Sequence, residues 1–473
     1  MQWLYPLITI IIFVSTNNVL AETYNDNGDN SAQEEQQPRF KKLRYEELYS
    51  APLSVGKNDN ILDKIKYLPV NDDTYISIGG EARLRYEYTH NPNYGENSQD
   101  KRGVLFQRYT IHTDVHLNNN ARFFLQLSSA LEAGRSVGPS PVEENKLEFQ
   151  NAFIDYTFDP NNANRTTLRT GRHEINLGSG RLVDVREGPN VRRTFDGVRL
   201  LHTGNKWDST VFALRPRLSK PDVLDDQTDK EKTIWGIYNT FTYKALTTDR
   251  LDLYYIGYNN NRSTYEQGTG HEKRHSIGTR LAGTVNSWEY NWELVYQFGK
   301  FGNANINAWT IATETGYQWK SLALQPRLII SANIASGDKD PDNPALQSFN
   351  ALFPRGNYFS EAAVVGPRNF FNFHPFLTVY PNEKWSFTSS INFFWRHELN
   401  DGLYGPSGQL LRAANGNTER YVGTSFSFNS EWSVNRNLTL TAIYSQWLPG
   451  DFIKATGSSE KIRFLELTMQ FKF

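Results

Sequence analysis

The sequence contains no cysteine and only two methionines among its 473 residues. Without cysteine, the chain can form neither a disulfide framework nor a thiolate metal site. Apart from a short apolar run near its start, no stretch approaches the ~20 apolar residues that a membrane-spanning helix requires, which excludes a helical membrane protein. The formal net charge is −1, and lysine and arginine are dispersed along the chain, so the sequence has no basic patch for nucleic acid.

The start of the chain is predicted to be a signal peptide spanning residues 1–21. A short apolar run is followed by Val19-Leu20-Ala21, which fits a cleavage site with small residues, although the first residues carry no lysine or arginine. Residues 22–74 are predicted to be a disordered or periplasmic lead-in, because their first part is polar and offers little to bury. Scattered apolar residues in 43–70 leave a short plug, a turn or a periplasmic lead-in as alternatives for that part.

The last ten residues alternate strictly between apolar and polar side chains. The apolar positions are Leu465, Leu467, Met469, Phe471 and Phe473. This period of two predicts a strand with one apolar face and one polar face. A chain that ends on such a strand, with Phe as its last residue, resembles a bacterial outer-membrane β-barrel, whose closing strand is also its assembly signal.

The same period of two recurs from Tyr75 onward and predicts eighteen strands. They lie near residues 75–89, 103–117, 121–133, 146–158, 166–173, 195–202, 207–217, 233–243, 250–258, 273–285, 288–299, 308–318, 321–334, 369–379, 385–397, 420–432, 438–447 and 462–473. Long connections such as 89–103 and 174–194 alternate with tight ones such as 118–120, an alternation that a soluble sandwich or propeller does not need. The predicted fold is therefore all-β: a transmembrane antiparallel barrel over 75–473, with short periplasmic turns, long extracellular loops and both termini periplasmic.

The polar side of each strand is predicted to face an aqueous lumen, because a barrel of this size encloses a channel. The candidate pore-lining or solute-binding residues are Glu81, Arg83, Arg85, Arg108, Asp155, Arg169, Arg199, Arg215, Arg280, Glu314, Arg327 and Arg396. Two interpretations stay open for these charges. They pair across neighbouring strands and stiffen the wall, or the planar arginine side chains offer repeated, exchangeable contacts to carboxylates of a passing solute.

Several segments together resemble the alginate-export family of bacterial outer-membrane β-barrel proteins. They include Arg44-Tyr-Glu-Glu, Ile78 to Glu87, Arg169 to Val183, Arg193 to Arg199, Ala335 to Asn343, Phe349 to Pro354 and Phe394-Trp-Arg396. The resemblance implies that a polyuronate, alginate, passes outward through an arginine-rich constriction. It also implies that Arg169, Arg172, Arg181, Arg193, Asp196 and Arg199 belong to the third outer loop and its flanking strands, which fold into the channel.

The predicted function is passive diffusion of a polar, anionic solute through an outer-membrane channel. The most specific version of this prediction is export of a uronate-containing polysaccharide such as alginate. A general or nutrient-uptake porin is the alternative, followed by an outer-membrane enzyme or a plugged structural barrel. No catalytic residue is predicted, because Ser179 lacks the strand-turn-helix context of a nucleophile and His112, His116 and His374 have no motif beside them. The expected partners are outer-membrane lipid and lipopolysaccharide, the barrel assembly machinery and the saccharide, with no nucleic acid.

Asp338, Asp340 and Asp342 place three carboxylates at alternate positions of a long outer loop. Such carboxylates could gather around Ca²⁺, but the segment lacks the glycine and the downstream glutamate of an EF-hand loop. A solvated acidic turn is therefore the favoured interpretation, the three aspartates are only weak metal candidates, and no cofactor is predicted.

Overall fold

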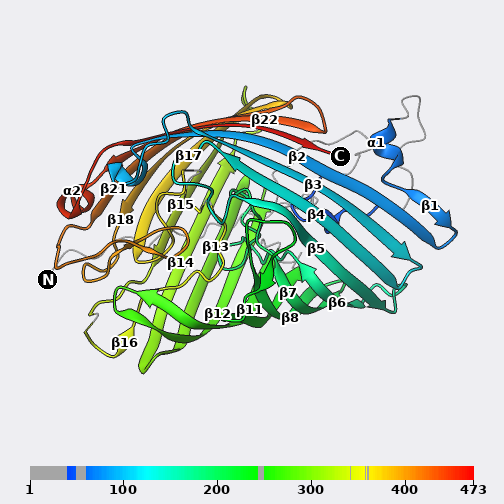
Figure 1. Ribbon diagram of the computed structural model, residues 1–473, viewed down its shortest axis with the longest axis horizontal. Coiled ribbons are helices and arrows are strands. Elements are labelled where there is room, and N and C mark those ends of the chain that lie inside the picture. The colour runs from blue at the N-terminus through cyan, green and yellow to red at the C-terminus, as the bar shows by residue number, and fades with distance from the viewer. Residues whose placement is uncertain (1–39, 50–59, 243–249, 341, 357, 360–361) are drawn as a thin grey trace. The chain divides into compact units, whose positions relative to one another are not determined.

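The computed structural model describes residues 40–49, 60–242, 250–340, 342–356, 358–359 and 362–473. The predicted signal peptide and most of the lead-in lie outside the described residues. Within them, eighteen strands form one closed antiparallel barrel, because the last strand, β23, pairs with the first, β2, from Glu81↔Lys472 to His90↔Arg463 (Figure 1). The predicted barrel and its strand number are confirmed.

The barrel strands are β2 (Thr74–His90), β3 (Val104–Leu117), β4 (Ala121–Ala133), β5 (Asn145–Phe158), β6 (Arg165–His173), β7 (Phe195–Thr203), β8 (Trp207–Leu218), β10 (Lys232–Thr242), β11 (Arg250–Tyr265), β12 (Gly268–Val285), β13 (Trp288–Phe301), β14 (Ala304–Gln318), β15 (Arg327–Ala335), β17 (Phe370–Asn382), β18 (Trp385–Trp395), β21 (Tyr421–Ser433), β22 (Leu438–Pro449) and β23 (Ile462–Lys472). Short elements outside the barrel wall are η1 (Arg44–Glu46), α1 (Ile61–Lys64), β1 (Leu68–Asn71), η2 (Pro92–Gly95), β9 (Gln227–Thr228), β16 (Ala345–Leu346), β19 (Leu403–Tyr404), β20 (Leu410–Arg412) and α2 (Asp451–Thr456). No helix among the described residues is long and apolar enough to cross a membrane.

The two ends of the barrel differ in their connections. Tight turns such as 118–120 and 286–287 lie at one end, the short-turn end, where β2 also begins and β23 also ends. Connections such as 174–194 and 336–369 lie at the other, the long-loop end, which α2 and β16 mark at the left of Figure 1. The β11–β12 connection at this end is only a tight turn at 266–267, because β11 and β12 extend beyond the strands predicted from the sequence and form a long hairpin.

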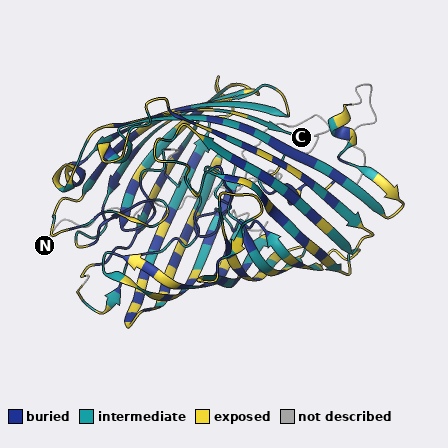
Figure 2. Cartoon of the chain, in the orientation of Figure 1, coloured by how far each residue is buried: buried dark blue, intermediate teal, exposed yellow. Residues whose placement is uncertain are grey.

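The outward face of the barrel is apolar, as β13 shows. Its even-numbered residues, from Trp288 through Trp292, Leu294 and Tyr296 to Phe298, include large exposed hydrophobic side chains. The odd-numbered Glu293, Val295 and Gln297 between them are buried, and the same alternation runs along most strands in Figure 2. Large apolar side chains on the outside of a closed barrel match the lipid-facing band of an outer-membrane protein.

The inward face is polar in some strands and apolar in others. In β8, Phe212 and Leu214 are buried, whereas Val211, Ala213 and Arg215 are exposed. Arg215 was predicted to line the lumen, but it lies on the outer face, where it donates to the carbonyl oxygen of Lys230 at 2.8 Å. The alternation is ambiguous here because both faces of β8 carry apolar residues, and the inward set packs in an apolar cluster that includes loop residues.

Candidate functional site: a loop-filled lumen

The N-terminal segment 40–49 lies inside the barrel. The ring of Tyr45 packs edge-on against Phe124 and Phe153, with ring centroids 6.0 and 5.3 Å apart, and both partners sit on the buried face of β4 and β5. The Arg169 guanidinium lies 4.2 Å from the Tyr45 ring centroid. The Tyr45 hydroxyl donates to the carbonyl oxygen of Glu174 at 2.7 Å. A short plug, a turn and a periplasmic lead-in were the alternatives for residues 43–70. For residues 40–49, these contacts inside the barrel fit a plug.

Arg44 joins this segment to the seam where the barrel closes. It donates to the carbonyl oxygen of Gly80 in β2 at 2.9 Å and to that of Phe473, directly after β23, at 2.8 Å. Its Nε donates to the Glu47 carboxylate at 2.7 Å. One buried guanidinium thus connects the first strand, the end of the last strand and the N-terminal segment.

The long loop 174–194 crosses the lumen from one wall to the other. On the first wall, Arg83 in β2 donates to the carbonyl oxygen of Glu187 at 3.1 Å, and Arg108 in β3 donates to the Glu187 carboxylate at 2.5 Å. On the far side, Arg181 of the loop pairs with Glu293 in β13 at 3.1 Å and with Glu314 in β14 at 3.2 Å. Because β2 and β3 lie opposite β13 and β14 in the strand order, the loop spans the channel.

A second loop, 336–369, packs on the first. The N–H of Asp184 donates to the carbonyl oxygen of Phe353 at 2.9 Å, and the N–H of Phe353 donates to the carbonyl oxygen of Leu182 at 2.9 Å. The Phe353 ring stands perpendicular to that of Phe195, with centroids 5.2 Å apart. The two loops and segment 40–49 therefore narrow the passage from inside.

Most of the predicted lumen arginines bind carboxylates. Arg108 binds Glu81 at 2.8 Å, Arg169 binds Asp155 at 2.8 Å, Arg280 binds Asp252 at 3.0 Å, Arg327 binds Glu289 at 2.5 Å, and Arg85 binds Glu87 at 2.9 Å and Glu143 at 3.2 Å. The structure brings Glu81, Arg83, Arg85 and Arg108 together on one wall, and places Glu314 and Arg280 on the opposite one. A guanidinium held by a carboxylate adds no net charge to the passage.

Other arginines, Arg83, Arg186, Arg193 and Arg199 among them, are held by neutral oxygen atoms instead. Arg83 donates to the Glu187 carbonyl and to Asn190 Oδ1 at 3.3 Å, and Arg199 donates to Thr210 Oγ1 at 3.4 Å. Arg186 donates to the carbonyl oxygen of Val191 and Arg193 to that of Pro354, both at 3.2 Å. Burial and, after it, the nearby positive charge of Arg186 together lower the pKa of Arg193 to about 9. The contact between the two loops thus holds a surplus of positive charge.

Arg396 was predicted to line the lumen at the end of a strand over 385–397, but the strand ends at Trp395. The Arg396 side chain is fully buried and donates to the carbonyl oxygens of Leu399 at 2.8 Å, Asn417 at 2.8 Å and Glu419 at 2.6 Å. It therefore organises the outer loop 396–420 rather than the channel wall. The alternation of apolar and polar residues in the sequence continues to Arg396, although the strand ends at Trp395.

The three aspartates of the outer loop form a chain of turns. The N–H of Asp340 binds Asp338 Oδ1 at 3.2 Å, and the N–H of Asp342 binds Asp340 Oδ1 at 3.1 Å. Burial, together with the nearby Asp401 carboxylate, raises the pKa of Asp338 to about 6. Over the described ranges, no group of three or more His, Asp or Glu side chains is placed to hold a metal ion.

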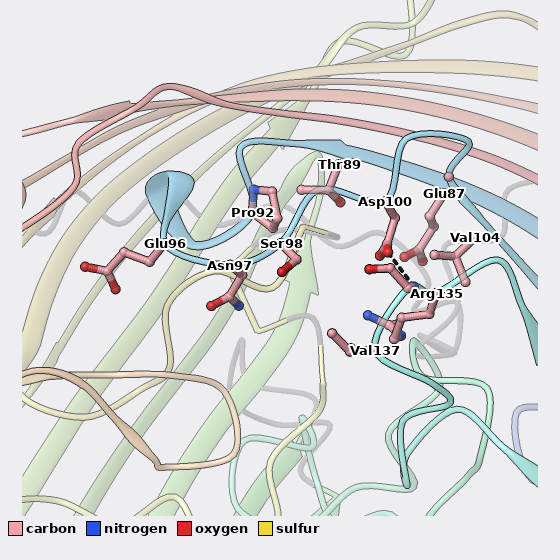
Figure 3. A pocket seen from close by; sticks show the side chains of 12 residues that line it. Glu87, Thr89, Pro92, Glu96, Asn97, Ser98, Asp100, Val104, Arg135 and Val137 are labelled. Carbon is pink, nitrogen blue, oxygen red and sulfur yellow. Dashed lines mark hydrogen bonds between the residues drawn. The ribbon is translucent and has the colours of Figure 1, made fainter.

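A pocket of about 460 Å³ opens beside the loop 91–103 (Figure 3). Glu87, Glu96, Asp100 and Arg135 line it, and the N–H of Ser136 binds Asp100 Oδ1 at 2.7 Å. No motif in the sequence predicted this pocket. Glu187 was likewise not among the predicted site residues, and its sequence signal is its place in a long, charged connection between two strands.

Comparisons with known proteins agree with this architecture. A family model described as alginate export matches residues 74–465. The fold is similar to OccAB1 of Acinetobacter baumannii, with a TM-score of 0.56 and 11% identity over 87% of this chain and 99% of that one. It is also similar to a BenF-like porin from Pseudomonas fluorescens Pf-5, with a TM-score of 0.56 and 10% identity over 84% and 98% of the two chains. The search of curated proteins finds no match.

Proposed function

The chain belongs to the alginate export family, and from this membership we propose that it exports a uronate-containing polysaccharide such as alginate. It is an outer-membrane channel with the barrel of a porin. The observation that carries the choice of an anionic solute is the pair Arg186 and Arg193, whose charges are held by carbonyl oxygens and not by carboxylates. Rings of arginine select anions in channels.

The proposed mechanism is a series of weak contacts between arginines and the carboxylates of the passing chain. A guanidinium bound only to neutral oxygen atoms can exchange part of its hydrogen bonding for a solute carboxylate, with which it forms a charge-assisted bond. Each contact must be strong enough for entry and weak enough for exit. Arg83, Arg186, Arg193 and Arg199 are the residues in this role, and the carboxylate-bound arginines hold the loops in place.

The orientation and partners form part of the same proposal. The start of β2 and the end of β23 both lie on the periplasmic side, and the long loops lie on the extracellular side. Bacterial barrels have short periplasmic turns and long extracellular loops, which supports this orientation. Assembly uses the barrel assembly machinery, and the surrounding partners are outer-membrane lipid and lipopolysaccharide. A non-enzymatic channel is part of the same proposal, and it is supported by the porin-like barrel and by Ser179, which donates to the Glu293 carboxylate at 2.8 Å and not to a histidine.

A test of this function measures single-channel conductance in a planar bilayer under a salt gradient, before and after addition of an oligouronate. We expect a reversal potential on the anion side and block by the oligouronate. A neutral oligosaccharide of equal length is the matched control and leaves the current unchanged. A non-selective pore that ignores both sugars would contradict the anionic solute and would favour the alternative below.

The alternative is a general or nutrient-uptake porin. It is favoured by one observation, the neutralisation of most lumen arginines by carboxylates such as Asp155 and Asp252. The two functions separate in the same experiment, because only the polyuronate channel distinguishes the charged sugar from the neutral one.

A further inference from the structure

The outward face of β11–β14 changes from apolar to basic at the long-loop end. On β13 the apolar outward residues run from Trp288 to Phe298, and the next outward residue is Lys300. Ten residues rise ~34 Å along a strand, which is ~25 Å along the membrane normal at the usual tilt. This matches the height of the lipid-facing band, so Lys300 stands where lipid headgroups begin.

Lys300 is joined there by a second lysine. Lys273 in β12 is the direct cross-strand partner of Lys300, and both side chains are exposed. Directly opposed side chains have Cβ atoms about 5 Å apart, and like charges at this separation repel. Among the described residues, neither lysine forms an ion pair within 4 Å. The pair therefore has an unfavourable interaction that an anion between the two ammonium groups would relieve.

The described strands around the lysine pair contribute no competing acid. The outward-facing residues of the described strands β11–β14 include no Asp or Glu, and Glu272 between His271 and Lys273 faces inward, where it binds Arg274. The neighbours are neutral amides: Asn259 opposes Lys273, and Asn305 opposes Lys300. Asn259 Oδ1 accepts a 2.8 Å hydrogen bond from Nε2 of His271. This is a cationic patch with hydrogen-bonding groups around it.

Aromatic side chains lie directly below the lysine pair. His275 stacks on Phe298 with ring centroids 5.3 Å apart, and its Nδ1 is 2.6 Å from the Tyr255 hydroxyl. Trp235 approaches the same histidine edge-on at 6.3 Å. Such a belt of aromatic rings marks the boundary between acyl chains and headgroups. A ligand of the patch that also contacts this belt needs both an anionic head and acyl chains.

We propose that Lys273 and Lys300 bind a phosphate group of a glycolipid in the outer leaflet, with Asn259 and Asn305 as flanking hydrogen-bond partners. The lysines serve as point charges for the phosphate, and the acyl chains lie on the apolar face of β12 and β13 below. The site is on the outside of the wall and does not touch the passage. It rests on the proposed orientation, in which the long-loop end faces outward.

The test measures binding of diphosphorylated lipid A to the purified full-length mature protein in detergent by native mass spectrometry. We expect Lys273→Gln with Lys300→Gln to weaken binding about thirtyfold, which corresponds to ~1 kcal/mol for each lysine near a charged lipid surface. The matched control is Lys320→Gln with Lys384→Gln, which removes the same charge from exposed turns at the other end and leaves binding unchanged. Dephosphorylated lipid A should bind weakly to the unaltered protein. Its affinity should equal that of intact lipid A for the Lys273/Lys300 variant.

Three results would overturn the site. They are equal binding of lipid A to the Lys273/Lys300 variant, equal binding of the dephosphorylated lipid, and displacement of lipid A by inorganic phosphate at the same concentration, which would indicate a free-anion site. Conductance of each variant in a bilayer verifies that it is folded. Conductance also separates this site from the channel function, because neither lysine faces the lumen.

Discussion

Arginine side chains inside this barrel have two kinds of partner, and the kind of partner decides their effect on the channel. Arg169 and Asp155 form a two-bond pair at 2.8 Å that cancels both charges. Arg193, in contrast, is held by the carbonyl oxygens of Asp184 and Pro354 at 3.4 and 3.2 Å. A carbonyl satisfies the donors but leaves the positive charge in place. The charge balance of a lumen therefore depends on individual partners and not on the total number of arginines.

This difference predicts the outcome of removing single arginines. Arg193→Gln should move the reversal potential under a salt gradient by several millivolts toward the cation side, because one uncompensated charge leaves the contact between the two loops. Arg215→Gln removes the same charge from the outer face and should leave the potential unchanged. Equal shifts in both variants would show that selectivity is set by overall charge and not at the loop contact.

At the scale of elements, three chain segments that are distant in sequence assemble inside the barrel. Segment 40–49 packs on β4 and β5, loop 174–194 bridges opposite walls, and loop 336–369 packs on that bridge. Asn190 illustrates how tightly the bridge is held, since its Nδ2 donates to the carbonyl oxygens of Gln107 and Glu143, both at 3.0 Å. The passage is thus shaped by segments that are not part of the wall.

Deletion of residues 40–49 from the mature chain should increase the single-channel conductance. The segment occupies lumen volume and holds loop 174–194 through Tyr45 and the Glu174 carbonyl, so its loss both empties space and frees one edge of the loop. Tyr45→Phe is the milder control, because it removes only the hydrogen bond and keeps the ring between Phe124 and Phe153. An unchanged conductance after the deletion would mean that the current passes elsewhere in the lumen.

At the scale of the whole molecule, closure of the barrel depends on one seam, between β2 and β23. The seam contains a directly opposed pair of carboxylates, Glu87 and Glu466. Glu87 has Arg85 as a partner at 2.9 Å, and Glu466 accepts the Thr468 hydroxyl at 2.7 Å. Like charges directly opposite each other destabilise a strand pair, so closure takes place against a local repulsion.

Glu466→Gln should therefore stabilise the closed barrel by up to about 1 kcal/mol, the usual range for a cross-strand pair. The change is read as a higher temperature of unfolding in detergent. Glu460→Gln, an exposed substitution in the loop before β23, is the control for a general change in net charge. A lower unfolding temperature for Glu466→Gln would show that the carboxylate has a favourable partner at the seam.

The sequence by itself determined the barrel, because its signals are local. A period of two between Tyr75 and Phe473 and the alternation of tight and long connections depend only on neighbouring residues, and they predicted eighteen strands with most bounds within a few residues. The same local signal could not settle β8, where both faces are apolar, so Arg215 was assigned to the wrong side. It also predicted that the strand ending at Trp395 continues to residue 397, and so placed Arg396 in the wall.

Only the tertiary structure decided what fills the lumen and which charges stay uncompensated there. The contacts between Tyr45 and Phe124, or between Arg83 and Glu187, join residues far apart in the chain, and no periodicity reports them. Whether an arginine meets a carboxylate or a carbonyl depends on how loops 174–194 and 336–369 pack within the closed wall. The wall follows from alternation along the chain, whereas the channel follows from long-range packing inside it.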